Sequence, residues 1–338
     1  MSRRRTALQT RLVLCAVTAS ALLLSGCGAQ GALVGLHPAP PEASTSAPLD
    51  AEGAGAIATR LLSEAGAVAA EKGKAGDAAR AEILAGDALT VANAASARGA
   101  AEPPPETLQV PPEATLLGQS QGREWPRAIL AATLDESTNV QVLHVMMSTA
   151  PAEPFRIVSQ VSMLAGSELP ALAAPSEGAP MLAMTQKEGL PGSPEEVVKA
   201  YAAALAHPKP TASALVTTTD PFAVALKASA DKQSKDLGAL GTLTQTHTPD
   251  LKGAVSFRLA DGGAVTFALM RRTDTYKASA KTKELTLPAD LAAVAGRRAV
   301  TSTAEFGSLE PIAMVLPPTA GAAEAIAATD LLVSGKGR

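Results

Sequence analysis

The chain has 338 residues, 46% of them hydrophobic but only 2% aromatic, and its 29 lysines and arginines stand against 32 acidic residues. The net charge of −3, with one tryptophan and two tyrosines, argues against nucleic acid as a partner, because neither a basic domain nor aromatic stacking platforms are available. The length suits two domains of about 100–150 residues with an aliphatic core.

The chain begins with a predicted export signal. Four arginines make its start positive, and residues 12–24 form an apolar stretch of about a dozen residues, shorter than the ~20 that span a bilayer. These arginines are Arg3, Arg4, Arg5 and Arg11. We expect residues 1–26 to be a signal peptide that is removed. Its removal changes the formal net charge from −3 to −7, because four arginines and no acidic residue are lost.

Cys27 follows Leu24, Ser25 and Gly26, which is the residue order of a lipobox. This first segment resembles the signals of bacterial lipoproteins. The resemblance implies cleavage before Cys27 and a thioether from its sulfur to diacylglycerol, so that Cys27 is the lipidation site. An ordinary secretory signal cut near Ala29 and an uncleaved anchor are the alternatives.

Residues 27–49 are predicted to be a flexible tether, because the prolines at 38, 40, 41 and 48 alternate with small residues that cannot bury enough surface to fold. Two or three acyl chains, at ~0.8 kcal/mol per buried CH₂, hold a protein durably on a membrane. We therefore expect a lipid-anchored protein on the outer face of the cytoplasmic membrane. Cys15 leaves with the signal and Cys27 is alkylated, so no thiol remains for redox chemistry.

Residues 50–165 are predicted to form a first α+β module. Asp50 can cap one helix, and Asp77 can cap a second helix that ends near Gly99. After a proline-rich connection, the hydrophobic period changes from helical to extended. Three strands are expected in an antiparallel meander, at residues 127–134, 140–148 and 155–164.

A proline-rich linker at 166–192 precedes a second predicted module at 193–338. Ser193 and Glu196 form a capping box, which indicates the start of a helix. Asp220 caps another helix in the same way.

Strands at 255–259 and 265–269 alternate apolar and polar residues, and Gly262 between them supplies the positive φ of a tight hairpin. Further strands are expected at 284–287, 299–306, 312–316 and 330–334.

The predicted fold class is α+β, with two modules that each pack helices on a curved antiparallel sheet. The order of elements resembles cystatin-like or nuclear-transport-factor-like folds. The runs Ala-Ala-Thr-Leu-Asp at 131–135 and Val-Gln-Val-Leu at 140–143 are similar to runs in a group of uncharacterised actinomycete lipoproteins. That resemblance implies export and anchoring, and it carries no activity or catalytic residue.

Charge is uneven along the chain. Residues 252–298 hold nine lysines and arginines against four acidic residues, whereas the rest of the mature chain carries a large negative excess. A basic face of this kind can lie on anionic lipid headgroups or acidic wall polymers, at ~1 kcal/mol per cationic side chain. The alternative is an ordinary solvated sheet face.

The sequence contains no recognisable combination of catalytic residues, and we predict no bound metal ion and no cofactor. None of the four histidines has ligand spacing, and His144 is expected to be a partly buried, hydrogen-bonded strand residue. Ser229 and Lys232 form an S-x-x-K pattern whose companion motifs are missing. Trp125 is expected to be a lone core anchor.

The sequence therefore predicts an exported, lipid-anchored envelope protein, more a non-catalytic binding or assembly module than an enzyme. The expected partners are the membrane, through the anchor, and an envelope protein or a wall polymer. One alternative is a lipid- or small-molecule-binding lipoprotein with an apolar pocket. The other alternative is a hydrolase whose catalytic residues are dispersed along the sequence.

Overall fold

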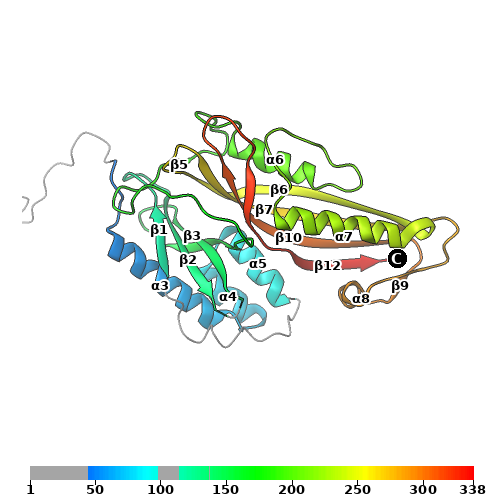
Figure 1. Cartoon of the computed structure of the whole chain (residues 1–338). Helices are drawn as coiled ribbons and strands as arrows, with labels where there is room; N and C mark the ends of the chain where they lie inside the picture. Colours follow the sequence, from blue (N-terminus) through cyan, green and yellow to red (C-terminus); the bar gives the residue numbers. More distant parts are fainter. Residues whose placement is uncertain (1–44, 98–113, 137) are drawn as a thin grey trace, which may run out of the picture. The chain divides into compact units, whose positions relative to one another are not determined.

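The computed structural model describes residues 45–97, 114–136 and 138–338 (Figure 1). The predicted signal peptide, Cys27 with its lipobox and the tether up to residue 44 lie outside the described residues, as does the proline-rich connection at 98–113. The described residues from Thr45 to Arg338 belong to one compact unit. None of their helices is both long and apolar enough to cross a membrane.

An antiparallel four-stranded sheet carries three helices on one of its faces. Its strands, in spatial order, are β1 (Thr115–Gln119), β2 (Arg127–Asp135), β3 (Val140–Ser148) and β4 (Arg156–Ser162). The helices are α3 (Ala51–Val68), α4 (Gly73–Ile83) and α5 (Gly86–Ala97). Ala58 and Leu61 of α3 pack with Ile129 and Met146 of the sheet. The predicted meander is confirmed, and β1 pairs with its first strand.

The prediction of one helix from Asp77 to about Gly99 is wrong, because the structure has two helices there, α4 and α5. The chain breaks between α4 and α5, where Leu84 is extended and bridges Ile157 of β4. Gly86 then takes a positive φ of 52°. The break buries Leu84 against the sheet, which a continuous helix would not allow. Asp77 does not cap a helix but pairs with the buried Arg80 at 2.6 Å.

A second antiparallel sheet is built around the long hairpin of β6 (Gly241–Arg258) and β7 (Ala264–Ala278). Its other strands are β5 (Met181–Leu182) beside β6, β10 (Thr303–Leu316) beside β7, and β11 (Glu324–Ala328) and β12 (Leu331–Gly337) beside β10. The predicted hairpin turn is confirmed, since Gly262 has a φ of 91°. A small separate pair, β8 (Leu285–Thr286) and β9 (Ala299–Val300), flanks α8 (Ala289–Ala295).

The long strands exceed the lengths that the sequence predicts. The predicted strands at 255–259 and 265–269 are only the turn-proximal part of β6 and β7. Similarly, the predicted strands at 299–306 and 312–316 correspond to β9 and a single continuous β10. The extra segments escape detection because polar side chains such as Gln245 occupy inward positions and interrupt the apolar alternation.

The helices α6 (Pro194–Ala204) and α7 (Pro221–Leu237) begin as predicted. Ser193 Oγ accepts a hydrogen bond from the Glu196 amide at 3.2 Å, and Glu196 Oε2 accepts one from the Ser193 amide at 2.9 Å. Asp220 accepts from the Ala223 amide at 2.8 Å and from the buried Tyr201 hydroxyl at 3.0 Å. The second cap therefore also ties α7 to α6.

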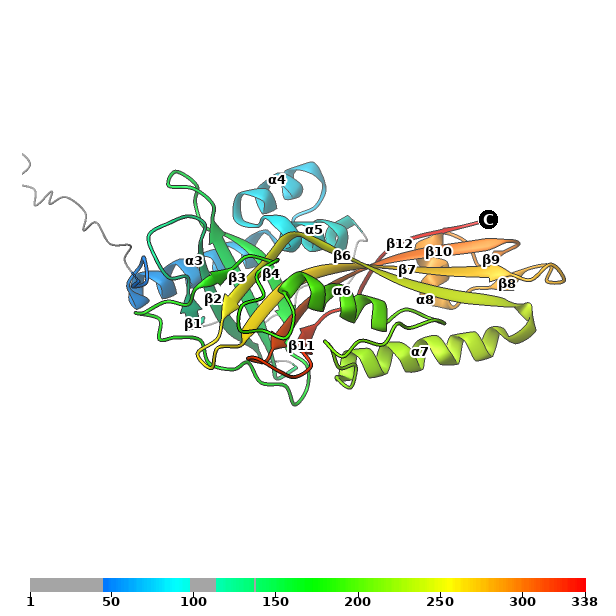
Figure 2. The same cartoon turned by 90° about the horizontal axis from the view of Figure 1, so that it is seen from above.

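The two sheets share a core, whereas the sequence predicts two modules joined by a linker. Leu130 of the first sheet packs in one cluster with Phe257 and Phe267 of the second. The layers are therefore α3 to α5, the first sheet, the second sheet, and α6 with α7 (Figures 1 and 2). Residues 166–192 belong to this core, since they supply β5 and the buried Ala179. The mixed class, with helices on antiparallel sheets, is confirmed.

Candidate functional site

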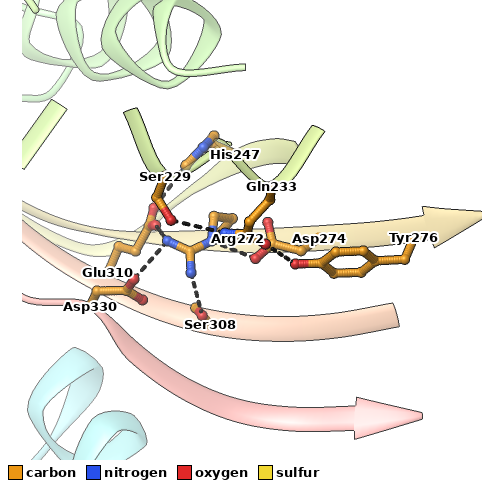
Figure 3. Close-up of polar contacts among 9 residues, drawn as sticks. All are labelled: Ser229, Gln233, His247, Arg272, Asp274, Tyr276, Ser308, Glu310 and Asp330. Atoms are coloured by element: carbon orange, nitrogen blue, oxygen red, sulfur yellow. Dashed lines mark hydrogen bonds and ion pairs between the residues drawn. The ribbon is translucent and has the colours of Figure 1, made fainter. Parts of the chain in front are cut away.

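A cluster of charged side chains is buried on the face of the second sheet that packs against α6 and α7 (Figure 3). Its centre is Arg272 of β7, which lies directly opposite His247 of β6 and Ser308 of β10 in the strand register. Residues directly opposite one another, and residues two apart on one strand, share a face of a sheet. We name this set the Arg272 cluster: His247, Arg272, Asp274, Ser308, Glu310 and Asp330.

The guanidinium of Arg272 makes a hydrogen bond through each of its nitrogens. Nη1 donates to Glu310 Oε1 at 2.7 Å and to Asp330 Oδ2 at 2.8 Å. Nε donates to Asp274 Oδ2 at 3.1 Å, and Nη2 donates to Ser308 Oγ at 3.1 Å. One side chain thus connects β7, β10 and the segment between β11 and β12. Hydrogen bonds between ionised groups are stronger than neutral ones, so this arrangement fixes the register of the strands.

His247 extends the cluster to β6. Its Nδ1 lies 2.8 Å from Glu310 Oε2, and both side chains are fully buried. A carboxylate only accepts hydrogen bonds, so Nδ1 is the donor. Glu310 of β10 therefore binds Arg272 of β7 with one oxygen and His247 of β6 with the other, and it links three neighbouring strands.

Apolar residues enclose the cluster at both ends along the strands. Met270 and Ile312 lie on one side, in the apolar cluster that includes α6. Tyr276 and Phe306 lie on the other, with their rings edge to face at 5.7 Å. The Tyr276 hydroxyl donates to Gln233 of α7, which in turn donates to Ser229 at 2.9 Å, as Figure 3 shows. Arg272, Asp274 and Glu310 therefore lie in an environment of low polarity, whereas Asp330 is exposed at the edge of the cluster.

Burial and charge compete within the cluster. Burial alone would lower the pKa of Arg272, but Asp274, Glu310 and Asp330 raise it overall. Burial raises the pKa of Asp274 above its usual value, although Arg272 opposes that change. Three carboxylates surround one guanidinium, so Arg272 is the cation that they share, and it offsets one of their three negative charges.

The cluster leaves some of its polar atoms unsatisfied. Among the described residues, Gln245 Oε1, His247 Nε2 and Asp274 Oδ1 are buried without a hydrogen-bond partner. Within the same residues, no group of three or more His, Cys, Asp or Glu side chains is arranged to hold a metal ion. The position that a metal ion would need is occupied by the guanidinium of Arg272. The arrangement can hold β6, β7 and β10 together.

A second polar arrangement lies where α5 meets β6. Asp87 of α5 is 6% exposed, and a Cβ at Gly253 would lie 2.7 Å from its Oδ1, so a larger residue at 253 would displace the Asp87 side chain. Burial, together with the nearby carboxylate of Asp250, raises the pKa of Asp87 to about 7, although Arg271 opposes the shift. Arg271 Nη2 also pairs with Asp250 Oδ2 at 3.0 Å.

Two shallow hollows lie on the surface of the described residues. The larger, of about 530 Å³, is beside this arrangement, and the smaller, of about 170 Å³, lies between β10 and β12. The larger is lined by Thr248, Pro249, Asp250, Leu251, Lys252 and Arg271. The smaller is lined by Thr273, Glu305, Phe306, Gly307, Ser334, Gly335 and Lys336. Both linings include charged side chains.

The residues singled out by sequence analysis have mixed outcomes. Cys27, Leu24, Ser25 and Gly26 lie outside the described residues, so lipidation stays a prediction. His144 is confirmed as a buried, hydrogen-bonded strand residue, with contacts of 2.8 Å to Thr133 and 3.1 Å to Gln160. Burial lowers the pKa of His144 to about 4.

Two further interpretations are settled by side-chain contacts. Trp125 is only half-buried, so its interpretation as a core anchor is wrong; it stacks on Arg127 at 3.8 Å. The S-x-x-K residues do not meet, because Lys232 pairs with Asp236 at 2.6 Å while Ser229 bonds to Gln233.

The basic stretch at 252–298 is divided by the fold. Arg272 is buried, Arg271 pairs with Asp250, and Arg258 donates to two backbone carbonyls. Its exposed remainder lies at the end of the long hairpin that is farther from the first sheet. The C-terminal residues join it, since the Arg338 amide donates to the Thr303 carbonyl at 2.8 Å. We name this set the cationic end: Lys277, Lys281, Lys283, Arg297, Arg298, Lys336 and Arg338.

Sequence analysis did not identify the Arg272 cluster. Its signal is present in the sequence, because Arg272, Asp274 and Glu310 occupy inward positions of strands whose other inward positions are apolar. These positions can be recognised as inward-facing only when the bounds of β7 and β10 are known.

The family described as "Domain of unknown function (DUF8094)" matches residues 54–337, which is most of the chain. The chain therefore belongs to this family. No curated protein and no solved structure matches it.

Proposed function

We propose that the protein is an exported lipoprotein, anchored through Cys27 to the outer face of the cytoplasmic membrane, whose folded body is a binding or assembly module for an anionic envelope component. The lipobox supports the anchor, and the cationic end supports the binding role. The tether at 27–49 gives the body room to reach a partner away from the lipid.

The observation that carries the binding role is the charge of the cationic end. Residues 277–305 and 336–338 contain seven lysines and arginines against three acidic residues, although the chain as a whole is acidic. Each cationic side chain near an anionic surface is worth ~1 kcal/mol. Seven side chains gathered at one end of a sheet are therefore enough to hold a polyanion or an acidic protein face at moderate salt.

Two measurements test the proposal separately. Mass spectrometry of the protein from its native membrane should find the mature chain beginning at Cys27 with diacylglycerol on the sulfur, and Cys27→Ser should release it from the membrane fraction. An unmodified amino terminus would overturn the anchor.

The binding role is tested by crosslinking in intact cells. Replacing Lys281, Lys283 and Arg297 with glutamine should reduce partner recovery. The matched control replaces Lys72, Lys74 and Lys209, which are equally exposed but lie outside the cationic end. Equal recovery from both triple variants would overturn the role of the cationic end.

The alternative of an apolar ligand pocket has less support. The face of the second sheet that meets α6 is filled by large side chains, Tyr201, Met270 and Met314, all with no exposed surface. Both hollows have charged side chains in their linings, Asp250, Lys252 and Arg271 in the larger and Glu305 and Lys336 in the smaller. No specific observation favours a dispersed hydrolytic site over a binding surface.

We also propose that the two halves are related to cystatin-like or nuclear-transport-factor-like folds. The support is that each sheet is antiparallel and carries its own helices, α3 to α5 on the first and α6 with α7 on the second. An experimental structure whose halves fail to superpose on either fold would contradict this relationship.

A further inference from the structure

Leu240 lies exposed at the far end of the long hairpin, in the short turn Gly238–Leu240 that joins α7 to β6. Three large apolar side chains are exposed in the described part of the chain, and Leu240 is one of them, at 53%. Its neighbours Gly238 and Ala239 are exposed as well. A single exposed leucine is ordinary on a protein surface, so its surroundings decide whether it has a role.

Four lysines lie around this turn. Lys235 is in the last turn of α7, Lys277 lies opposite Thr242 in the strand register, and two more lysines follow in the loop after β7. All four are exposed, and none of them makes an ion pair with another described residue. We name this set the hairpin tip: Lys235, Gly238, Ala239, Leu240, Lys277, Lys281 and Lys283.

Hydrogen bonds hold the loop after β7 against the turn. The Ser279 amide donates to the Leu240 carbonyl oxygen at 2.8 Å, and Thr282 Oγ1 donates to the same oxygen at 2.7 Å. Lys281 lies between these two donors in the chain, so it is held close to Leu240. In Figure 2 the turn from α7 into β6 and the loop after β7 lie together at the end of the hairpin. A preformed surface of this kind loses less conformational entropy when it binds.

The acidic residues beside the hairpin tip leave it positively charged. Asp236 pairs with Lys232 at 2.6 Å, so these two charges offset each other. Glu284 is exposed and offsets one of the four lysines, which leaves a net charge of +3. On the adjoining α8, Asp290 stands against two arginines at 297–298. The tip therefore presents unpaired positive charge around an exposed leucine.

We infer that the hairpin tip docks on the anionic lipid surface of the membrane, with the lysines among the headgroups and Leu240 at the boundary with the acyl chains. A bilayer surface offers negative charge and an apolar layer side by side, which is what this combination of side chains matches. A soluble polyanion matches the lysines but offers nothing to Leu240. The proposed anchor would keep the tip near lipid at high effective concentration, so a weak contact is enough. This inference rests on the proposed binding role and names lipid as the anionic component.

The test measures co-sedimentation of the mature chain, residues 27–338, with phosphatidylcholine vesicles that contain or lack phosphatidylglycerol. Every chain carries Cys27→Ser, so no acyl chain contributes to binding. The parent should bind the anionic vesicles about tenfold more tightly than the neutral ones, or better. Leu240→Ser should weaken that binding by about fivefold or more. The matched control, Val224→Ser, removes an apolar side chain that is 52% exposed on α7 outside the tip, and it should bind as the parent does.

A charge variant completes the design. Lys281→Gln with Lys283→Gln should weaken binding to anionic vesicles by about tenfold or more and should reduce its dependence on salt. Its control, Lys72→Gln with Lys74→Gln, removes two exposed lysines outside the tip and should have no effect.

Two results would overturn the inference. One is a parent chain that binds neutral and anionic vesicles equally. The other is a Leu240→Ser chain that binds as its Val224→Ser control does; if the lysine variant still loses binding, the partner is an acidic polymer or protein, and the binding role stands without lipid. The binding role fails separately, if the lysine variant binds anionic vesicles and recovers partners in cells as its control does.

Discussion

Arg272 of β7 and Glu310 of β10 form a buried ion pair, with Nη1 2.7 Å from Oε1 and with the Glu310 side chain fully buried. Strands that carry this pair also carry apolar clusters at both ends of it. Removal of one member of a buried pair leaves an uncompensated charge, which costs about 3–5 kcal/mol. The ion pair therefore stabilises a single register between β7 and β10, because any other register would separate its two charges.

The first prediction concerns this pair. Arg272→Met should lower the free energy of unfolding by about 3–5 kcal/mol, because three carboxylates lose their shared cation. Glu310→Gln should lower it by less, about 1–3 kcal/mol, because Arg272 keeps Asp274 and Asp330 as partners. Chemical denaturation measures both. The control, Asp236→Asn, breaks an exposed pair with Lys232 and should cost no more than about 1 kcal/mol. Similar small losses in all three variants would contradict the structural role of the cluster.

The second prediction concerns Asp87, whose pKa is raised to about 7, chiefly by burial. The unfolded chain releases this proton near pH 4, whereas the folded chain holds it to about pH 7. Stability from this group is therefore full below about pH 4 and is lost as pH rises to about 7, by about 4 kcal/mol at most. Asp87→Asn should remove this loss when unfolding is measured at pH 4 and pH 8. The exposed control, Glu177→Gln, should keep it.

The third prediction concerns His144, whose pKa is lowered to about 4 by burial. The unfolded chain gains a proton near pH 6.5, whereas the folded chain does so only near pH 4. Stability from this group is therefore full above about pH 6.5 and is lost as pH falls to about 4. Its sign is opposite to that of Asp87, so the two partly cancel in the wild type. NMR titration of the His144 ring should give a midpoint near pH 4, and a midpoint above 6 would contradict its burial.

The fourth prediction concerns the segment at 166–192, which the sequence presents as a linker. Gly166 and Gly178 both have a φ of 77°, but a Cβ at Gly166 would meet nothing, whereas one at Gly178 would lie 2.8 Å from the Ser120 carbonyl oxygen. Gly166→Ala should cost about 1–2 kcal/mol, for the left-handed backbone alone. Gly178→Ala should cost about 1–3 kcal/mol more, because backbone must move. Thermal or chemical unfolding measures both variants. If the two substitutions lowered the free energy of unfolding equally, the segment at 166–192 would not be packed against Ser120.

Local signals in the sequence predict local structure well here. The capping box at Ser193, the cap at Asp220 and the turn at Gly262 each depend on residues within three positions of one another, and all are confirmed. The interruption after Ile83 escapes prediction because it depends on a bridge from Leu84 to Ile157, more than 70 residues away in the chain. Helical periodicity alone continues through that point.

The sequence by itself determined the caps, the hairpin turn, the alternation of the strands near it and the presence of helices on antiparallel sheets, because these depend on neighbouring residues. It also contains the order Leu-Ser-Gly-Cys at 24–27, from which lipidation of Cys27 is predicted. Only the tertiary structure decided that both sheets share one core, that Arg272 meets Glu310 and Asp330 from distant segments, and that the C-terminal residues join the cationic end. These relationships depend on which strands pair and in which register, and such long-range pairing is the sum of many weak contacts that no local pattern records.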